Sequence, residues 1–250
     1  MYICFHMERK KYLMLMAGGS GTRMGSAMPK QFLEISGKAI LHLTLEKFCS
    51  VVPDIKVIVV LPETHIHLWR QYCLERNVAV PQTIVKGGIS RFHSVRNGLE
   101  KVPDGATVAI HDGVRPLLSR GMIEKMFSMS GKIPALVPVI PCTDTMRMLK
   151  REKAYDGKER LVGMHGAAPD RNVLFRVQTP QIFHSELIKK AYAQPYDPSF
   201  TDDASVAESS GAELSFVEGE NINMKITTRE DLLLARAIVS FDFPVSSGTC

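Results

Sequence analysis

An α/β fold is the architecture that this 250-residue sequence predicts: a Rossmann-like, mainly parallel sheet with helices on both faces. Short apolar runs typical of strands alternate along the chain with segments whose apolar residues have helical spacing, and this order is typical of parallel sheets. The run at 55–61 is almost continuously apolar, as in strands that are buried on both faces. Glycine-rich or polar segments follow several of the strands, where sheets of this type bind ligands.

Strands and helices are predicted to alternate through the first half of the chain. Helices are expected where apolar residues recur every three or four positions, as Leu41, Leu45 and Phe48 do. Strands are expected where short apolar runs end at glycines or polar groups. The predicted strands are 12–16, 55–61, 83–86 and 107–110, and the predicted helices are 39–49, 65–76 and 92–100.

The second half continues this alternation up to residue 140 and resumes it after residue 170. Ser119 is a good N-cap for a helix that buries Ile123 and Met126. A capping box at 228–231 precedes the last helix. The predicted strands are 135–140, 173–178 and 223–227, and the predicted helices are the one after Ser119, 201–208 and 232–239.

The segment at about 141–170 breaks the rhythm of strands and helices. Its charged run at 150–153 is too polar for a core and predicts an extended arm with a polar turn. Such an arm in a compact enzyme often reaches a second subunit, and the alternative is a plain surface loop. We expect one domain at 12–240 that includes the arm, an N-terminal extension at 1–11 and a C-terminal tail at 241–250.

Composition and charge narrow the class of protein. The net charge of +5 suits an anionic substrate, but the basic residues are scattered, so no nucleic-acid partner is expected. Five cysteines without a C-x-x-C pair argue against disulfides and structural zinc and favour a cytoplasmic protein. No apolar run approaches the roughly 18 residues of a membrane span, so no membrane partner is expected. The histidines form no metal-binding motif, and His65 and His67 are expected on the surface.

A glycine-rich loop follows the first predicted strand and is the strongest functional signal. Glycines at 18, 19, 21 and 25 let the backbone approach a ligand and point N–H groups at phosphate oxygens. Arg23 and Lys30 add positive charge, which favours a polyphosphate. Met24 stands where a dinucleotide-binding fingerprint needs glycine, and no Gly-Lys-Ser/Thr of a P-loop occurs. A plain strand-to-helix turn, the alternative, needs neither the arginine nor the lysine.

The segment 111–116 follows another predicted strand and contains a carboxylate. Asp112 at this position is a candidate ligand for a divalent cation. Gly113 allows the chain to pass close to a ribose. Arg115 is a candidate phosphate ligand, or it pairs with Asp112 and only shapes the loop.

Further polar groups lie next to other predicted strands. Gly88 permits close approach to a flat ring and Ser94 can bind a base edge, although a plain helix start explains them equally well. Arg171 ends the arm, and Thr179 is held extended by the following proline. Lys225 lies within an apolar alternation, and a lysine in a covered strand needs an anion. The alternative is a lysine on an exposed edge.

Nine motifs occur in one order and together carry a resemblance. They are A-G-G-S-G-T-R-M-G, P-K-Q, G-G-x-x-R-x-x-S-V, H-D-G-V-R-P, D-T-M, D-R-N, Q-T-P-Q-x-F, T-D-D-A-S and N-x-K-I-T-T. The ordered set resembles the 2-C-methyl-D-erythritol 4-phosphate cytidylyltransferases of the non-mevalonate isoprenoid pathway, over residues 12–239. The resemblance implies a fold of the nucleotide-diphospho-sugar transferase type and a reaction of CTP with methylerythritol phosphate that releases pyrophosphate.

The motifs and the resemblance together assign roles to particular residues. Catalytic roles, through charge stabilisation at the phosphates, are expected for Arg23, Lys30, Arg171 and Lys225. Contacts with CTP are expected for Ala17, Gly18, Gly19, Gly21, Gly88, Ser94, Asp112 and Gly113. Contacts with the acceptor substrate are expected for Arg115, Thr145, Arg171, Thr179 and Thr201.

The resemblance also implies a cofactor and a partner. Mg²⁺ or another divalent cation is the expected cofactor, with Asp112 as its candidate ligand. A homodimer is expected through the arm, which brings Thr145 and Arg171 to the site of the partner subunit. Two positions depart from the commoner family pattern: Gly18 stands where alanine is frequent, and Ile89 stands where an acidic residue is frequent.

Two other functions compete with this interpretation. Ribitol-5-phosphate cytidylyltransferases contain a very similar glycine-rich loop, but Asp170-Arg171-Asn172 ahead of Gln178-Thr179-Pro180 favours the methylerythritol enzymes. A non-catalytic nucleotide-binding regulatory protein could retain the fold, but binding alone does not need all four basic residues that are assigned to catalysis.

Overall fold

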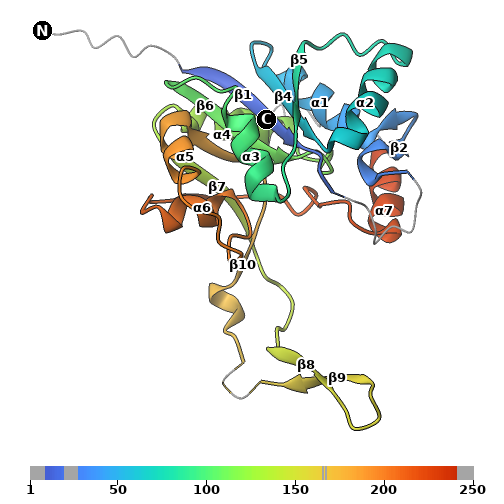
Figure 1. Ribbon diagram of the computed structural model, residues 1–250, viewed down its shortest axis with the longest axis vertical. Coiled ribbons are helices and arrows are strands. Elements are labelled where there is room, and N and C mark those ends of the chain that lie inside the picture. Colours follow the sequence, from blue (N-terminus) through green and yellow to red (C-terminus); the bar gives the residue numbers. More distant parts are fainter. Residues whose placement is uncertain (1–8, 20–27, 165, 167, 241–250) are drawn as a thin grey trace, which may run out of the picture.

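An eight-stranded sheet forms the centre of the computed structural model, which describes residues 9–19, 28–164, 166 and 168–240 (Figure 1). The strand order is β10-β7-β11-β6-β1-β4-β5, and β12 also pairs with β7. The strands are β1 (Lys10–Met16), β4 (Lys56–Leu61), β5 (Gln82–Lys86), β6 (Ala106–Asp112), β7 (Ala135–Pro141), β10 (Phe175–Val177), β11 (Gln181–His184) and β12 (Ser215–Glu218).

The sheet is mainly parallel, which confirms the predicted fold class. β1 pairs in parallel with β4 and β6, β4 with β5, and β7 with β12. β10 and β11 run antiparallel to their neighbours. Met16 pairs with Asp112, so β1 and β6 end side by side, and the N–H of Gly113 donates to the Met16 carbonyl at 2.9 Å. The two loops that follow these strands therefore begin in contact.

Seven helices surround the sheet within the described residues. Ser119 accepts a hydrogen bond from the Met122 N–H at the start of α4, and Thr228 accepts one from the Asp231 N–H at the start of α7, so both predicted caps are confirmed. The helices are α1 (Ile40–Val51), α2 (Glu63–Glu75), α3 (Arg91–Leu99), α4 (Arg120–Ser130), α5 (Ser185–Ala191), α6 (Asp203–Ser209) and α7 (Arg229–Ser240).

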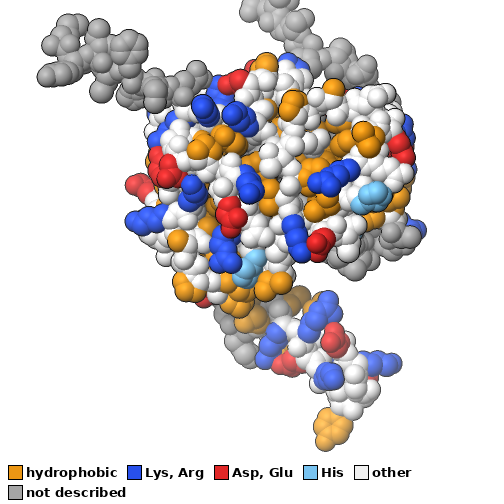
Figure 2. All heavy atoms as spheres, turned by 45° about the horizontal axis from the view of Figure 1, so that its top comes forward, with side chains coloured by type: hydrophobic (Ala, Val, Ile, Leu, Met, Phe, Trp, Pro, Cys, Tyr) orange, Lys and Arg blue, Asp and Glu red, His pale blue; other side chains and the backbone are white. Residues whose placement is uncertain are grey.

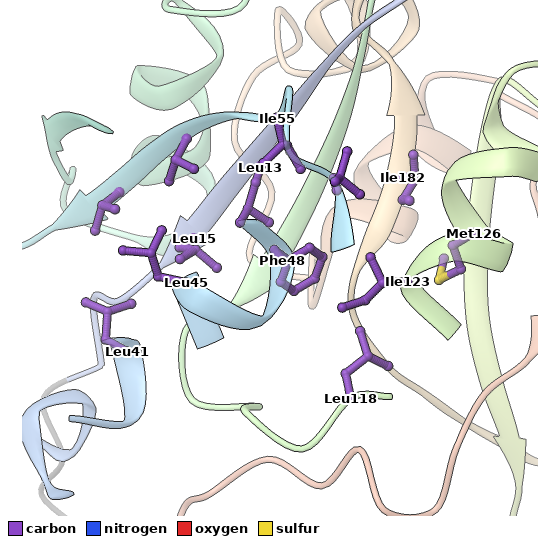
Figure 3. Packing of buried hydrophobic residues seen from close by; sticks show 14 of the residues in the cluster. Leu13, Leu15, Leu41, Leu45, Phe48, Ile55, Leu118, Ile123, Met126 and Ile182 are labelled. Atoms are coloured by element: carbon purple, nitrogen blue, oxygen red, sulfur yellow. The ribbon is translucent and has the colours of Figure 1, made fainter. Parts of the chain in front are cut away.

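Successive residues of β1 point into two separate cores, because neighbouring side chains of a strand face opposite sides of a sheet. Leu13 and Leu15 pack in the cluster that contains Phe48 of α1 and Ile123 of α4 (Figure 3). Met14 belongs to a second cluster, with residues of α3, α5 and α6. Helices thus cover both faces of the sheet, and the apolar composition of its central strands follows from that burial.

The predicted strand at 223–227 is wrong. These residues, all of them described, form an irregular segment between β12 and α7. Its backbone is attached to the loop after β6, because the Ile226 N–H donates to the Val114 carbonyl at 3.0 Å. Ile226 is buried in a third cluster with Ile35, Ile40 and α7 residues. The apolar alternation therefore reflects burial against a loop and a helix rather than strand pairing.

Several short elements were not predicted from the sequence. They are β11, β12, α5, the short 3-10 helices η2 (Lys30–Phe32) and η3 (Arg171–Val173), and a small hairpin of β2 (Glu34–Ile35) and β3 (Lys38–Ala39). Each is at most seven residues long. Residues 10 and 11 belong to β1, so the expected N-terminal extension ends earlier than predicted. Residues 1–8 and 241–250, which cover the rest of that extension and the expected tail, lie outside the described residues.

A hairpin of β8 (Leu149–Lys153) and β9 (Glu159–Gly163) projects from the body within the segment 141–170 (Figure 1). Every residue of these two strands is exposed. The hairpin therefore packs on no other part of the described chain, as its charged composition predicts. Among the described residues, no helix is long and apolar enough to cross a membrane.

Candidate active site

A pocket of about 310 Å³ lies at the carboxyl ends of β1, β5 and β6. Eight residues that the sequence assigned to catalysis or CTP binding line it, although they come from four separate segments of the chain. Three of these segments follow parallel strands that end at one edge of the sheet, and Lys225 comes from the irregular segment between β12 and α7. The lining residues are Met16, Ala17, Gly18, Gly19, Lys30, Gln31, Gly88, Ile89, Ser90, Arg91, Ser94, Asp112, Val114 and Lys225.

Asp112 forms the electrostatic centre of this pocket. Its Oδ2 lies 3.1 Å from Lys225 Nζ and 3.1 Å from Arg115 Nε. Burial alone would raise the pKa of Asp112, but the charges of Lys225, Arg115 and Arg91 outweigh it and hold the pKa well below its usual value. Asp112 is therefore an ionised carboxylate at neutral pH, and it holds Lys225 at the pocket.

Arg115 is half-buried and faces Asp112 and a backbone carbonyl. Its Nη1 donates to the Asn223 carbonyl at 2.7 Å, in addition to the Asp112 contact. Of the two interpretations that the sequence left open, this geometry supports the ion pair that shapes the loop. Contact between Arg115 and a substrate phosphate stays a prediction.

The position of Lys225 depends on the fully buried Asn223, two residues earlier. The Asn223 side-chain amide donates to the Thr179 carbonyl at 2.9 Å, and the backbone carbonyl of Asn223 accepts from Arg115. These bonds fix the irregular segment on the loop after β6, and 42% of the Lys225 side chain remains exposed at the pocket. The lysine thus has its anion, Asp112, as the sequence argument required, but in a loop rather than a strand.

Thr179 and His111 form a buried hydrogen-bond chain that ends at the backbone of Asp112. Thr179 Oγ1 accepts from the Asp112 N–H at 3.1 Å and lies 3.0 Å from His111 Nδ1. Burial lowers the pKa of His111 to about 4, so the ring is neutral. His111 Nε2 faces the Arg115 carbonyl and must donate, so Nδ1 accepts the Thr179 hydroxyl proton. The hydroxyl of Thr179 is therefore engaged inside the protein, and its predicted contact with the acceptor stays a prediction.

The loop between β5 and α3 forms the wall assigned to the base. Ser94 Oγ accepts from the Gly88 N–H at 3.0 Å and donates to the Ser90 carbonyl at 2.8 Å. A Cβ on residue 88 would lie 2.4 Å from the His93 Cβ, so only glycine fits here. Ser94 thus shapes the loop around Gly88, and Ile89, which is 94% exposed, stands at its rim.

Arg91 lines the same pocket, and its partner Asp203 was assigned no role from the sequence. The two Asp203 oxygens accept from Arg91 at 2.7 and 2.5 Å, and the Tyr192 hydroxyl donates to Oδ1 at 2.6 Å. Burial would lower the pKa of Arg91, but the Asp203 charge outweighs it and raises that pKa. In the sequence, Arg91 follows Gly88 by three residues, and Asp203 lies in the T-D-D motif. No local pattern shows that these two residues form a pair, because they are far apart in the chain.

Gln31 and His65 also gain importance from the structure. Gln31 is 1% exposed, and its Nε2 donates to the Ala17 carbonyl at 2.8 Å and lies 3.3 Å from His65 Nδ1. His65 is half-buried against Phe32, so its expected place on the surface is wrong. His67 is exposed, as expected.

Several predicted residues lie elsewhere. Thr145, Arg171 and Thr201 are exposed and are not among the described residues that line the pocket. Thr145 and Arg171 belong to the two ends of the arm, which leads away from the body (Figure 1). Gly113 lies beside the pocket, because its N–H donates to the carbonyl of Met16, which is one of the lining residues. Gly21 and Arg23 lie outside the described residues, so their roles stay predictions.

Side chains that could bind a metal ion are few among the described residues at the pocket, whereas charged side chains of both signs are spread over the molecular surface. On the face seen in Figure 2, Lys and Arg side chains are spread among acidic and apolar ones rather than gathered in one stripe. The described residues contain no group of three or more His, Cys, Asp or Glu that could hold a metal ion. Asp112 is the acidic residue of the pocket lining. A single carboxylate fits Mg²⁺, which is often bound through one or two carboxylates together with substrate phosphates.

This fold and this pocket define a nucleotidyltransferase: parallel strands end at a glycine-rich loop, two lysines and one carboxylate. The family model of IspD, 2-C-methyl-D-erythritol 4-phosphate cytidylyltransferase, matches residues 12–240. The chain belongs to this family.

Individual relatives agree with the family. A 2-C-methyl-D-erythritol 4-phosphate cytidylyltransferase of Porphyromonas gingivalis is 41% identical over 235 residues, which cover 94% of this chain and 100% of the relative. The 2-C-methyl-D-erythritol 4-phosphate cytidylyltransferase of Bacteroides fragilis is 42% identical over 226 residues, which cover 90% of this chain and 98% of the relative. The solved structure of the Francisella tularensis enzyme is similar with a TM-score of 0.73 at 26% identity, over 91% of this chain and 99% of that one.

Proposed function

We propose that this protein transfers a cytidylyl group from CTP to 2-C-methyl-D-erythritol 4-phosphate. The products are 4-diphosphocytidyl-2-C-methyl-D-erythritol and pyrophosphate, and the reaction belongs to the non-mevalonate isoprenoid pathway. The family match over nearly the whole chain supports the reaction. The observation that carries the chemistry is the convergence of Lys30, Lys225 and the first two glycines of the loop, Gly18 and Gly19, on one pocket.

The reaction needs positioning and charge neutralisation more than a covalent intermediate. A phosphate oxygen of the acceptor attacks the α-phosphorus of CTP and forms a new P–O bond. The bond from the α-phosphorus to the bridging oxygen breaks, and pyrophosphate leaves with that electron pair. No general base is required, because a phosphate monoester is already an anion near neutral pH.

The basic residues stabilise the charge that develops on the phosphates. Lys225 is held at the pocket by Asp112 and is assigned to the α-phosphate and the incoming phosphate. Lys30 lines the pocket beside the glycine-rich loop. Arg23 is assigned the same task from the sequence. Backbone N–H groups of the loop bind phosphate oxygens without adding flexible side chains.

The remaining wall of the pocket is assigned to the nucleoside. Gly88 and Ser94 would contact cytosine together with the backbone of Ala17 and Gly19, and Gly113 would contact ribose. The bonds between Ser94 and the Gly88–Ser90 loop support this assignment, because they make the wall rigid before the base arrives.

A divalent cation such as Mg²⁺ is proposed as the cofactor, held by Asp112 and the phosphates of CTP. When bound, it would neutralise phosphate charge. Asp112 suits this role because its pKa lies far below neutrality, so the carboxylate is available as a ligand. Lys225 and Arg115 both contact Oδ2, and they orient the carboxylate from one side.

A homodimer is proposed, in which the arm of each subunit reaches the site of the other. The arm and the adjoining sheet edge expose large apolar side chains, which is typical of surfaces that bind another protein. Free thiols and the use of CTP are consistent with a cytoplasmic enzyme. These apolar residues include Met146, Met148, Leu149, Leu161, Met164, Val173 and Phe175.

Mixing two inactive variants tests the dimer. We expect Arg171→Ala and Lys225→Ala each to lose most turnover, because each removes a cation from every active site. In a mixed dimer both defects fall on one site and the other site is intact, so the exchanged mixture should regain about a quarter of wild-type activity. Mass spectrometry under native conditions would verify the exchange. A mixture that contains mixed dimers but stays inactive would contradict a site shared between subunits.

Pyrophosphate release by the purified protein tests the reaction itself. We expect release with CTP, Mg²⁺ and methylerythritol phosphate, and little with ribitol 5-phosphate in its place. Removal of the divalent cation with EDTA should stop the release, and added Mg²⁺ should restore it. Release with ribitol 5-phosphate alone would keep the mechanism but change the acceptor, and no release with either would leave a nucleotide-binding protein.

A further inference from the structure

Gln31 connects the glycine-rich loop to the body of the protein. It lies in η2, directly after Lys30, and is buried at the pocket. One hydrogen of its amide nitrogen is donated to the Ala17 carbonyl at 2.8 Å. The other points to Nδ1 of His65 on α2, at 3.3 Å. Both hydrogens of the amide are thereby used.

The bond to Ala17 sets the direction of the next N–H group. A peptide unit is planar and trans, so its carbonyl and its N–H point in opposite directions. The Ala17 carbonyl points to the buried Gln31, and the Gly18 N–H therefore points away from it. Gly18 is exposed and lines the pocket, so this N–H is presented on the side where a ligand binds.

Packing does little to hold the peptide in this orientation. A Cβ on residue 18 would meet no atom within 4 Å, so Gly18 has open space around it. Two successive glycines also allow the backbone many conformations. The preceding peptide is fixed by the Ala17 N–H, which donates to the Val60 carbonyl at 2.9 Å. Among the described residues, the bond from Gln31 to the Ala17 carbonyl is the contact that orients the Ala17–Gly18 peptide.

The side-chain oxygen of Gln31 indicates that this residue acts through its amide nitrogen. Oε1 is buried and has no hydrogen-bond partner in the part of the chain that the structure describes. An unpaired buried oxygen destabilises a protein, and an apolar side chain of similar size would avoid that loss. The amide is therefore best explained by what Nε2 donates.

His65 completes the arrangement as an acceptor. Burial lowers the pKa of His65, so its ring is neutral near pH 7 and Nδ1 can accept a hydrogen bond. The His65 ring also packs nearly perpendicular to the ring of Phe32, the neighbour of Gln31, with 6.0 Å between ring centroids. α2 thus holds the Gln31 amide in the orientation that suits Ala17.

We propose that Gln31, oriented by His65, is a positioning residue that holds the Ala17–Gly18 peptide so that the Gly18 N–H donates to an acceptor oxygen of the bound nucleotide. This inference rests on the proposed use of CTP, and it adds a residue that touches no reacting atom. It also explains why a buried glutamine follows directly after the pocket lysine.

Substitution of Gln31 tests the proposal by CTP binding, measured by calorimetry without turnover. Gln31→Met keeps the length of the side chain and removes the donor, and we expect the Kd for CTP to rise about tenfold. Gln31→Glu places a carboxylate against the Ala17 carbonyl, and we expect a larger rise. His65→Phe keeps the ring packing and removes the acceptor, and a rise of about threefold is expected. Gln71→Met, an exposed glutamine of α2 that pairs with Glu75, is the matched control and should change nothing.

A second readout separates positioning from a general loss of structure. The backbone amide resonance of Gly18 should shift on CTP binding in the wild type, and this shift should shrink in Gln31→Met at an unchanged melting temperature. An unchanged Kd in Gln31→Met would overturn the proposal. Should that variant fail to fold, an unchanged Kd in His65→Phe would overturn it. CTP binding that depends on Gln31 in a protein without transferase activity would instead overturn the proposed reaction alone.

Discussion

Lys225→Ala is expected to lower kcat by about 10²–10³ and to leave the fold intact, because loss of one preorganised charge at a phosphoryl-type transition state costs about that much. Lys225 reaches the pocket from an irregular segment whose anchors are Asn223 and Ile226, so the fold does not depend on its side chain. Its ammonium lies 3.1 Å from Asp112 and faces the space assigned to the phosphates. Pyrophosphate release under saturating CTP and acceptor measures the effect.

Lys189→Ala is the control for this variant. Lys189 pairs with Asp104 on the surface, at 2.7 Å, and takes no part in the pocket lining. The Lys189→Ala substitution removes one positive charge from the protein, as Lys225→Ala does, and this variant should keep the wild-type rate. Arg23→Ala is expected from the sequence to behave like Lys225→Ala. A Lys225→Ala enzyme with a near-normal kcat would refute the role given to this lysine.

Asp203→Ala is expected to lower the free energy of unfolding by about 3 kcal/mol, because it leaves the half-buried Arg91 without its counter-charge and the buried Tyr192 hydroxyl without its acceptor. Asp203 is fully buried and accepts two hydrogen bonds from Arg91 and one from Tyr192. The Arg91–Asp203 ion pair connects the start of α3 with α6, and Arg91 lines the pocket. Its loss should therefore also weaken CTP binding. Urea unfolding measures the stability, with the fluorescence of Trp69, the single tryptophan, as the signal.

Two further variants make this prediction specific. Asp104→Ala removes a carboxylate from the exposed pair with Lys189, and the expected loss is below about 1 kcal/mol. The double variant Arg91→Met, Asp203→Leu removes both charges of the pair and should be more stable than Asp203→Ala alone. An Asp203→Ala protein with the wild-type unfolding midpoint would show that Arg91 needs no compensating charge.

The order of the main elements could be predicted because local patterns record burial. The strand at 55–61 is apolar because helices cover both its faces, and the helix at 39–49 has apolar residues at the positions that face the sheet. The same rule failed at 223–227, where Ile226 is buried against a loop and a helix. Alternating burial is a property that strands share with some irregular segments, so the pattern alone could not distinguish them.

The sequence by itself determined the chemistry of the site: a loop of glycines, basic residues that can bind phosphates, a carboxylate after a strand, and an ordered set of motifs that identifies the family. These signals are local, because a glycine or a charge is needed at a particular position of one loop. Only the tertiary structure decided which groups act together. Lys225 meets Asp112, Arg91 meets Asp203 and Gln31 meets Ala17 because loops and helices that are distant in the sequence pack together around the ends of the strands. Such pairings depend on long-range packing, which no short segment of sequence contains.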